Sequence, residues 1–442
     1  MILEFVILSV ITSFFDHGDG VAAEIWSRPK AKGKKPSKKV PTGNGSYSSV
    51  VEDGCQLVDK TELIMEFLQS QPSVYVIARP SRFGKSINLS MLRTFLDRRI
   101  NSSELFDGTL ISRQPHITDN YQNTHPVIFV SFKDCAAHSY NETLNKIGSV
   151  LADLYVDHNY LIPNLDERDT SAFQNIVIKN TTELELEHAL AELSHYLNLE
   201  FNKCCYVFID DYDTMILEAY FNGFHSQLLP FLVRLFSSVL NGNPNLEKAA
   251  LAGVFVYQVS GQALSNVRAA TVLDPIMIQH FGFQESEAKE LTIAGCRRDG
   301  SILDFVKLRS VYGGHRFAGG WVLFNPGSVT KAIDRRRIGR YWSLTPADVL
   351  VRKLVFKKGA LVRNALELLL ENRTVQKALG RGLNLDKMSQ EKYLWTTLVY
   401  AGYLNAVFSH EDKKTFDLMY NLNVPNLEVL KMLKENLVAA FS

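Results

Sequence analysis

A strand, a turn and a helix in immediate succession constrain this chain more than any other feature of its sequence. An apolar run at residues 74–77 leads directly into a turn that ends in Gly84, Lys85 and Ser86, and apolar side chains at helical spacing follow as far as Leu96. In this order the backbone N–H groups of the turn and the positive end of the helix dipole converge on an anion. The segment predicts a phosphate-binding loop, with Lys85 on the β- and γ-phosphates and Ser86 as a ligand of Mg²⁺.

The first position of this loop departs from the common GxxxxGK[ST] pattern, because Arg79 occupies the place of the first glycine. A Gly-Lys-Ser triplet also occurs by chance in long chains, so the prediction depends on the strand and the helix around it. Inside the loop, Arg82 either adds a charge-assisted contact to phosphate or points into solvent, and both alternatives stay open. The predicted nucleotide-binding residues are Arg79, Pro80, Ser81, Arg82, Phe83, Gly84, Lys85 and Ser86.

A second apolar run, at residues 204–209, ends in carboxylates. Its continuous apolar character is typical of a strand that is buried on both faces of a parallel sheet. In a P-loop ATPase the first acid after such a strand holds Mg²⁺ and the next polarises the attacking water. This comparison predicts the first role for Asp210 and the second for Asp211. The alternative is a solvated turn, where aspartate is also common.

Apolar strands alternate with helical patterns through the first part of the chain. Strands are predicted near 74–78, 127–132, 204–210 and 249–256, with helical periodicity between them. This alternation predicts an α/β fold that has a parallel sheet, helices on both faces and a ligand site at the carboxyl ends of the strands. From about residue 346 the pattern is helical. A length of 442 residues, 46% of them hydrophobic, allows a large core and two to three domains.

A series of segments matches one known family in order along the chain. They are Val58-Asp59-Lys60-Thr61, the loop at 79–86, 126–132, Ile209-Asp210-Asp211-Tyr212-Asp213, Phe281-Gly282-Phe283, 312–317, 324–329, Tyr341-Trp342, Ala401-Gly402-Tyr403-Leu404 and Val424-Pro425-Asn426. In these segments the chain resembles the predicted AAA-ATPase-like family, many of whose bacterial members carry a PD-(D/E)XK nuclease-like region at the carboxyl end. The loop of that family has arginine at the position of Arg79.

The resemblance implies the fold and the cofactors. It implies a P-loop NTPase domain of the AAA type at residues 47–345, followed at 346–442 by a helical lid and a winged-helix-like end. ATP and Mg²⁺ are the implied cofactors. No Asn-Lys-x-Asp segment of the kind that reads guanine is present, which favours ATP over GTP.

The resemblance also implies roles for single residues. The implied metal ligands are Ser86 and Asp210, and the implied catalytic residues are Lys85, Asp211 and Arg316. Arg316 would sense phosphate from the second half of the chain, and a structural bond to a backbone carbonyl is the alternative for it.

Three departures from the family pattern favour nucleotide binding over fast hydrolysis. Asp211 replaces the usual glutamate and is shorter by one methylene, and a displacement of about 1 Å can cost ~10²-fold in rate. Ala252 replaces a threonine at a strand end where AAA proteins place a polar residue that senses phosphate. After residue 426 we expect too little chain for a nuclease-like region. Hydrolysis of ATP is therefore expected to be slow or degenerate.

The amino terminus predicts secretion. Residues 1–23 combine an apolar run with the small residues Val21, Ala22 and Ala23, which is typical of a signal peptide cleaved after Ala23. Residues 24–46 are rich in lysine, proline and glycine and predict a basic disordered linker. A secreted glycoprotein is the expectation, and a cytoplasmic protein is the alternative. Glycosylation sequons occur at Asn44, Asn88, Asn101, Asn141, Asn180 and Asn372, of which Asn88, on the predicted helix after the phosphate loop, is expected to stay unmodified.

Charge limits the classes of function. Residues 24–40 carry a surplus of six positive charges and residues 1–23 carry three negative ones, so the formal net charge of +1 leaves −2 for the rest of the chain. With this charge, the rest of the chain does not form a broadly basic surface for binding nucleic acid. The apolar run at the amino terminus is too short to span a bilayer, and no other stretch is long enough.

We therefore predict an ATP-binding P-loop protein, with ATP hydrolysis as the expected reaction. A protein partner is expected but unidentified, and the sequence leaves open whether the chain forms an oligomer. One alternative is a secreted interaction protein that keeps the fold without catalysis. The other is an ATPase that assists nucleic-acid processing in trans, and weak, salt-sensitive binding of DNA would favour it.

Overall fold

The computed structural model describes residues 40–41, 45–257, 267–299, 302–342 and 346–441. The predicted signal peptide at 1–23 and nearly all of the predicted linker at 24–46 lie outside the described residues. Both therefore stay predictions from the sequence.

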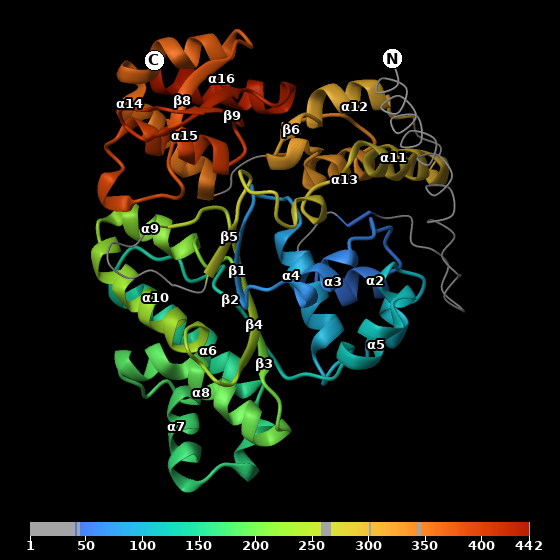
Figure 1. Ribbon diagram of the computed structural model, residues 1–442, viewed down its shortest axis with the longest axis vertical. Coiled ribbons are helices and arrows are strands. Elements are labelled where there is room, and N and C mark those ends of the chain that lie inside the picture. The colour runs from blue at the N-terminus through green and yellow to red at the C-terminus, as the bar shows by residue number, and fades with distance from the viewer. Residues whose placement is uncertain (1–39, 42–44, 258–266, 300–301, 343–345, 442) are drawn as a thin grey trace, which may run out of the picture.

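A five-stranded parallel sheet forms the centre of the molecule, with the strand order β2-β3-β4-β1-β5 (Figure 1). Its strands are β1 (Val74–Ala78), β2 (Val127–Ser131), β3 (Cys205–Asp210), β4 (Leu246–Gly253) and β5 (Val267–Ala270). The α/β fold with a parallel sheet is confirmed, and β1 to β4 lie where strands were predicted. β5 was not predicted, because its four residues include an arginine and form no apolar run.

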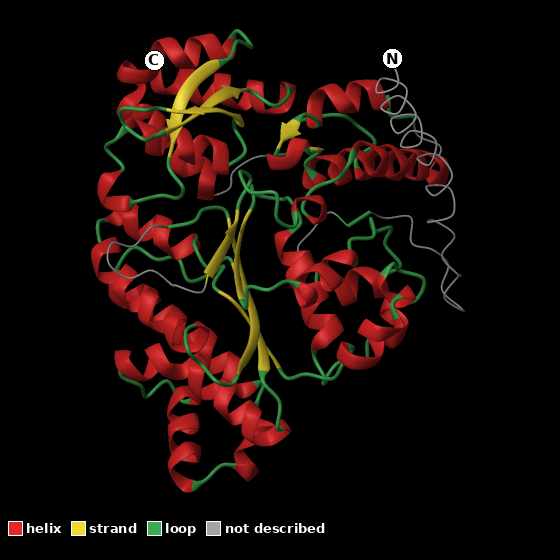
Figure 2. Ribbon diagram, viewed as in Figure 1, coloured by secondary structure: helices red, strands yellow, loops and turns green. Residues whose placement is uncertain are grey.

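Helices cover both faces of the sheet, so every residue of β1 and β3 is buried (Figure 2). Successive side chains of a strand point to opposite faces, and Val74 and Val76 accordingly join one hydrophobic core while Tyr75 and Ile77 join the other. On the face of Tyr75 pack α2 (Tyr47–Glu52), α3 (Glu62–Gln69), α4 (Lys85–Leu96) and α5 (Pro115–Tyr121). On the face of Val74 pack α6 (Tyr140–Val156), α7 (Glu167–Val177), α8 (Glu183–Phe201), α9 (Thr214–Asn222) and α10 (His225–Leu240).

Three further helices form a separate cluster, here called the roof, beside the loop that follows β1 (Figure 1). They are α11 (Glu285–Asp299), α12 (Phe305–Tyr312) and α13 (Pro326–Asp334), with the short strands β6 (His315–Arg316) and β7 (Val322–Leu323) between α12 and α13. Leu291, Leu308 and Val329 share the core of the roof. The roof touches the predicted phosphate loop directly, because the Gly327 N–H donates to the Arg82 carbonyl at 3.3 Å.

The carboxyl-terminal part combines helices with a small antiparallel sheet of strand order β8-β10-β9. Its elements are α14 (Pro346–Leu370), β8 (Val375–Leu379), α15 (Glu391–Tyr400), β9 (Asn405–Glu411), β10 (Leu418–Asn423) and α16 (Leu427–Phe441). The helical pattern did not predict the strands, because most side chains of β9 are exposed and form no apolar run. The buried Glu428 carboxylate of α16 accepts hydrogen bonds from the Ser328 hydroxyl and the Trp342 N–H, which ties this part to the roof.

None of the described helices combines the length and the apolar character needed to cross a bilayer. All five cysteines lie among the described residues, and all five are free thiols.

Candidate functional site

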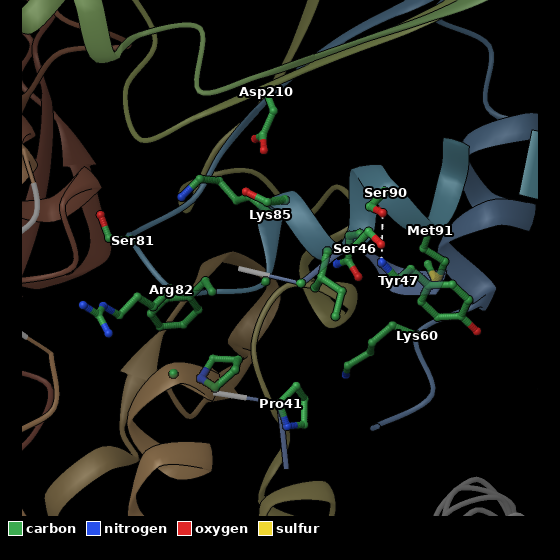
Figure 3. A pocket seen from close by; sticks show the side chains of 18 of the residues that line it. Pro41, Ser46, Tyr47, Lys60, Ser81, Arg82, Lys85, Ser90, Met91 and Asp210 are labelled. Carbon is green, nitrogen blue, oxygen red and sulfur yellow. Dashed lines mark hydrogen bonds between the residues drawn. The ribbon is translucent and has the colours of Figure 1, made fainter. Parts of the chain in front are cut away.

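A cavity of about 830 Å³ opens at the carboxyl ends of β1 and β3 (Figure 3). Its walls come from the loop at 81–86, the acidic strand end at Asp210, the segment before α3, and helix α13 of the roof. Sites for small molecules in proteins commonly enclose roughly 300–1,000 Å³. The two motifs that the sequence analysis singled out thus meet in one cavity of suitable size.

The loop between β1 and α4 borders this cavity and leads into the amino-terminal end of α4. Arg82 and Gly84 both have left-handed backbone conformations, with φ of 67° and 86°, which glycine adopts freely and arginine adopts rarely. Gly84 is the N-cap of α4, and no side chain caps the first turn. Helix amino termini carry unsatisfied N–H groups and a partial positive charge. The first turn of α4 is therefore available to an anion.

Lys85 reaches over the loop and is held there by the loop itself. Its ammonium donates to the carbonyls of Arg79 at 3.0 Å and Pro80 at 3.1 Å, and the side chain is only 7% exposed. These bonds use two of the three N–H donors of a lysine. Burial lowers the pKa of Lys85, and the nearby carboxylates, Asp211 first among them, oppose that shift. Lys85 is thus a fixed positive charge with donor capacity left for a ligand.

Asp210 and Lys85 line the same part of the cavity (Figure 3), and the Asp210 carboxylate is hydrogen-bonded to the Ser86 side chain. Burial raises the pKa of Asp210 to about 6, and repulsion from Asp211 adds to the shift, whereas the hydrogen bond with Ser86 and the charge of Lys85 oppose it. A buried carboxylate of this kind gains from a nearby cation. The two predicted metal ligands, Ser86 and Asp210, are therefore in contact, and Asp211 lines the same cavity with a left-handed φ of 52°.

Asp213 is a site residue whose role the sequence analysis missed. Its carboxylate accepts from the N–H groups of Val254 at 2.7 Å and Phe255 at 2.9 Å, just after β4. A Cβ on Gly253 would lie 2.8 Å from the Asp213 Cγ, so the close approach requires glycine. Burial raises the pKa of Asp213 to about 6. The Asp-x-Asp spacing after β3 and the glycine at the end of β4 were the available signals.

Arg79 was predicted to bind the nucleotide, and the structure corrects this role. Its side chain supports the backbone of the loop and does not line the cavity. The guanidinium is completely buried and donates to the carbonyls of Ala78 at 3.1 Å, Ala270 at 2.6 Å and Ile276 at 2.7 Å. Burial lowers the pKa of Arg79 to about 10. Neither Arg79 nor Pro80 lines the cavity. The physical reason is that Arg79 joins the end of β1 to the segment after β5.

The other predicted loop residues either line the cavity or hold the loop against the roof. Ser81 and Arg82 line the cavity, and the charge of Arg82 acts on Lys331 and Glu428 of neighbouring helices. Phe83 also borders the cavity, but its ring is fully buried, with centroid distances of 5.1 Å to His315 and 5.5 Å to Phe317. Phe83 therefore holds the loop against the roof by packing.

Arg316 does not reach the cavity, in contrast to its predicted sensing role. It is exposed on β6, and its backbone N–H donates to the Asn405 side chain at 2.8 Å. Lys331 of α13 lines the cavity in its place. Burial lowers the pKa of Lys331, and repulsion from Arg82 adds to that shift. No motif indicated Lys331, because α13 is brought over the loop only by the packing of the roof.

Lys60 connects the segment before α3 to the roof through hydrogen bonds. Its ammonium donates to both carboxylate oxygens of Glu287, at 2.7 and 2.8 Å, and to the Gln279 carbonyl at 2.8 Å. All three donors of the lysine are thereby used. The carboxylate of its neighbour Asp59 accepts from the N–H and hydroxyl of Thr61, just before α3, and from the Leu110 N–H at 2.9 Å.

One stretch of the cavity wall is apolar. Leu57 and Val58 of the segment before α3, Ile87 of α4, and Phe283 and Leu291 of the roof contribute to its walls. Leu57 packs against the core under α4, whereas Val58 packs against the core of the roof. The cavity therefore has one charged end, at Lys85 and the acids, and one apolar end that suits a flat ring.

The donor set at the charged end fits Mg²⁺. Magnesium prefers oxygen ligands, commonly one or two protein groups together with phosphate oxygens and water. Ser86 and Asp210 supply a hydroxyl and a carboxylate in contact with each other. Within the described residues, no group of three or more His, Cys, Asp or Glu side chains is arranged to hold a metal by itself.

Comparisons with known proteins agree with the geometry. Residues 41–261 match the sequence profile of a family described as a predicted AAA-ATPase. An uncharacterised protein from the vnfD 5′ region of Azotobacter chroococcum is 23% identical over 414 residues, covering 91% of this chain and 70% of that protein.

Two solved structures resemble the chain at low similarity. A Walker-type ATPase of Pyrococcus abyssi is 12% identical, with a TM-score of 0.41, and the match covers 87% of this chain and 97% of the other. The ORC2 protein of Aeropyrum pernix, solved in ADPNP and ADP complexes, is 11% identical, with a TM-score of 0.26, and the match covers 92% and 97% of the two chains.

Proposed function

The chain belongs to the family of predicted AAA-ATPases, and from this premise we propose that it binds ATP in the cavity and hydrolyses it slowly with Mg²⁺. The observation that carries the proposal is the meeting of Lys85, Ser86 and Asp210 at one end of a cavity whose other end is apolar. A nucleoside triphosphate has the same division into a charged chain and a flat base.

The charged end binds the phosphates through fixed groups. The first turn of α4 offers uncapped N–H groups, and Lys85 is held in place by two carbonyls of its own loop. Donors that are already oriented need little reorganisation when an anion arrives. Lys331 and Arg82 add positive charge from the roof side. The base occupies the apolar end, between the segment before α3 and the roof.

Hydrolysis requires a group that orients water, and Asp211 is that group in this proposal. When bound at Ser86 and Asp210, Mg²⁺ supplies charge neutralisation for the phosphate oxygens. Asp211 lines the cavity next to them and can accept a hydrogen bond from water. Its side chain is one methylene shorter than the glutamate of the family pattern, and such a displacement lowers the rate by up to ~10²-fold. Asp213 positions the end of β4 behind Asp211.

Binding and turnover of ATP by the full chain test this proposal. Calorimetry with Mg²⁺ and ATP measures binding, and release of inorganic phosphate measures turnover. We expect Lys85→Ala to lose both. Asp211→Asn should keep the affinity within a few-fold and lose turnover, because the amide leaves the phosphate contacts in place. Absence of ATP binding by the wild-type chain would refute the proposal.

A nucleotide-binding module without turnover is the second candidate. Ala252 favours it, because this buried residue at the end of β4 has no polar side-chain atom for a phosphate. The same assay separates the two candidates. Binding that depends on Lys85 together with an absence of phosphate release would identify the module.

A further inference from the structure

Two buried side-chain atoms of the described cavity wall have no hydrogen-bond partner: one is Arg93 Nε, which lies 3.8 Å from the Asp97 carboxylate, and the other is an acceptor. The acceptor is the amide oxygen Oε1 of Gln56, in the segment between α2 and α3. Buried acceptors in folded proteins are paired in the great majority of cases, because leaving one unpaired costs free energy. An unpaired acceptor on a cavity wall therefore points to a donor on the ligand.

Three other polar side chains that line the cavity already make hydrogen bonds within the protein. Lys60 spends its three donors on Glu287 and Gln279. The Ser90 hydroxyl accepts from the Tyr47 N–H at 2.9 Å (Figure 3), and the Asn88 amide donates to the His280 carbonyl at 2.8 Å. Gln56 Oε1 thus differs from these groups in being a buried acceptor of the described wall that no protein group pairs.

The position of Gln56 is at the apolar end of the cavity. Leu57 and Val58 follow it directly in the chain and also line the cavity, as does Phe283, which packs with Val58 against the core of the roof. Under the proposed function, this end holds the base. The ligand groups that can reach Gln56 are then the polar atoms on the edge of that base.

We propose that Gln56 determines base specificity by accepting a hydrogen bond from the exocyclic amino group of adenine. The inference rests on the proposed function, since it requires a nucleotide in the cavity. A site built to pair a ligand N–H rejects an analogue without it, because its own acceptor then stays unpaired. Purine riboside triphosphate is such an analogue: it has the ring and the phosphates of ATP and lacks the amino group.

The experiment compares the affinities of ATP and purine riboside triphosphate for the full chain with Mg²⁺. We expect the wild type to prefer ATP by about tenfold. Gln56→Leu should lower the affinity for ATP about tenfold and leave that for purine riboside triphosphate unchanged. Gln56→Glu keeps an acceptor and can only accept, so it should retain the preference. Gln174→Leu, which alters an exposed glutamine of α7, is the matched control and should behave as wild type.

The outcomes separate this inference from the function on which it rests. Equal affinity of the wild type for the two nucleotides, or an equal loss of both in Gln56→Leu, would overturn the role of Gln56 and leave ATP binding intact. Loss of the preference in Gln56→Glu would also overturn it, because the acceptor is still present. Failure of the wild type to bind either nucleotide would remove the proposed function, and this inference with it.

Discussion

The base and the centre of the phosphate loop each bury a cation, and the surroundings of the two cations differ. At the base, the terminal nitrogens of Arg79 donate to three backbone carbonyls, and its side chain lies outside the cavity. At the centre, Lys85 uses two donors on carbonyls and faces the carboxylates that follow β3. Both residues are almost fully buried.

The difference teaches that burial alone does not distinguish a binding cation from a structural one. Arg79 joins the end of β1 to the end of β5 and the segment that follows it, so its removal leaves carbonyl oxygens without donors. Lys85 bonds only to the loop that carries it and borders open space. Function is therefore indicated by donor capacity next to a cavity, and structure by bonds that connect separate segments.

The largest expected effect is on stability, and it falls on the base of the loop. Arg79→Met should lower the free energy of unfolding by on the order of 3 kcal/mol, because three buried carbonyls lose a charged donor. Lys85→Met should cost clearly less. Urea denaturation followed by circular dichroism measures both, with the exposed Arg113→Met as the control, expected within about 0.5 kcal/mol. Equal destabilisation by the Arg79 and Lys85 variants would break the comparison.

The second largest expected effect is a loss of affinity for ATP when Lys85, at the centre of the loop, is replaced. Lys85→Met should weaken binding of ATP at least ~100-fold, or about 2.7 kcal/mol, since the phosphates lose a desolvated positive charge. Lys133→Met removes an exposed lysine that also lines the cavity and should change the affinity less than about threefold. Titration calorimetry of both variants would show whether position in the loop, and not charge alone, decides binding.

A pH dependence should report on the acids that face Lys85. Burial raises the pKa of Asp213 in the folded state to about 6, above an unfolded value of 3.8. The folded state therefore binds the proton more tightly between these values, and this contribution to stability is full below about pH 4 and is lost as the pH rises through 6.

The variant Asp213→Asn isolates this contribution, because the amide does not titrate but keeps an oxygen for the Val254 and Phe255 N–H groups. Relative to wild type, it should gain on the order of 2 kcal/mol in unfolding free energy between pH 4.5 and pH 7. Urea denaturation of both proteins at the two pH values measures the gain. A difference that does not change with pH would show that Asp213 titrates normally.

The smallest expected effect compares two cations of the second half of the chain. Lys331→Met should weaken ATP binding about fivefold, or ~1 kcal/mol, because Lys331 lines the cavity. Arg316→Met should change it less than about twofold, because Arg316 lies on β6 outside the wall. Calorimetric titrations at one salt concentration suffice. A larger loss in Arg316→Met would restore the sensing role predicted from the sequence.

Much of the candidate site could be predicted, because its phosphate end is built from two short contiguous segments. Strand, loop and helix follow one another around Lys85, and Asp210 ends an unmistakable buried strand. Parallel strands bring their carboxyl ends to one edge of a sheet, so local sequence order already places these groups together. Secretion, glycosylation and the identity of a protein partner stay predictions.

The remaining parts could not be predicted because they depend on contacts between distant residues. The carbonyls that hold Arg79 lie 191 and 197 residues away from it, and Lys60 meets Glu287 across 227 residues. A spacing pattern carries no information about such pairs. The replacement of Arg316 by Lys331 at the cavity has the same origin.

The amino-acid order alone specifies the chemistry of the phosphate end, since a lysine, a hydroxyl and a carboxylate at the ends of buried strands need only a parallel sheet to meet. The packing of the roof and of the segment after β5 specifies everything that surrounds those groups. It turns Arg79 into a support, joins the segment before α3 to the roof through Lys60, and leaves the amide oxygen of Gln56 without a hydrogen-bond partner among the described residues. The physical reason is that the role of a donor or a charge depends on which groups lie next to it in the folded protein. Those groups come from distant parts of the chain.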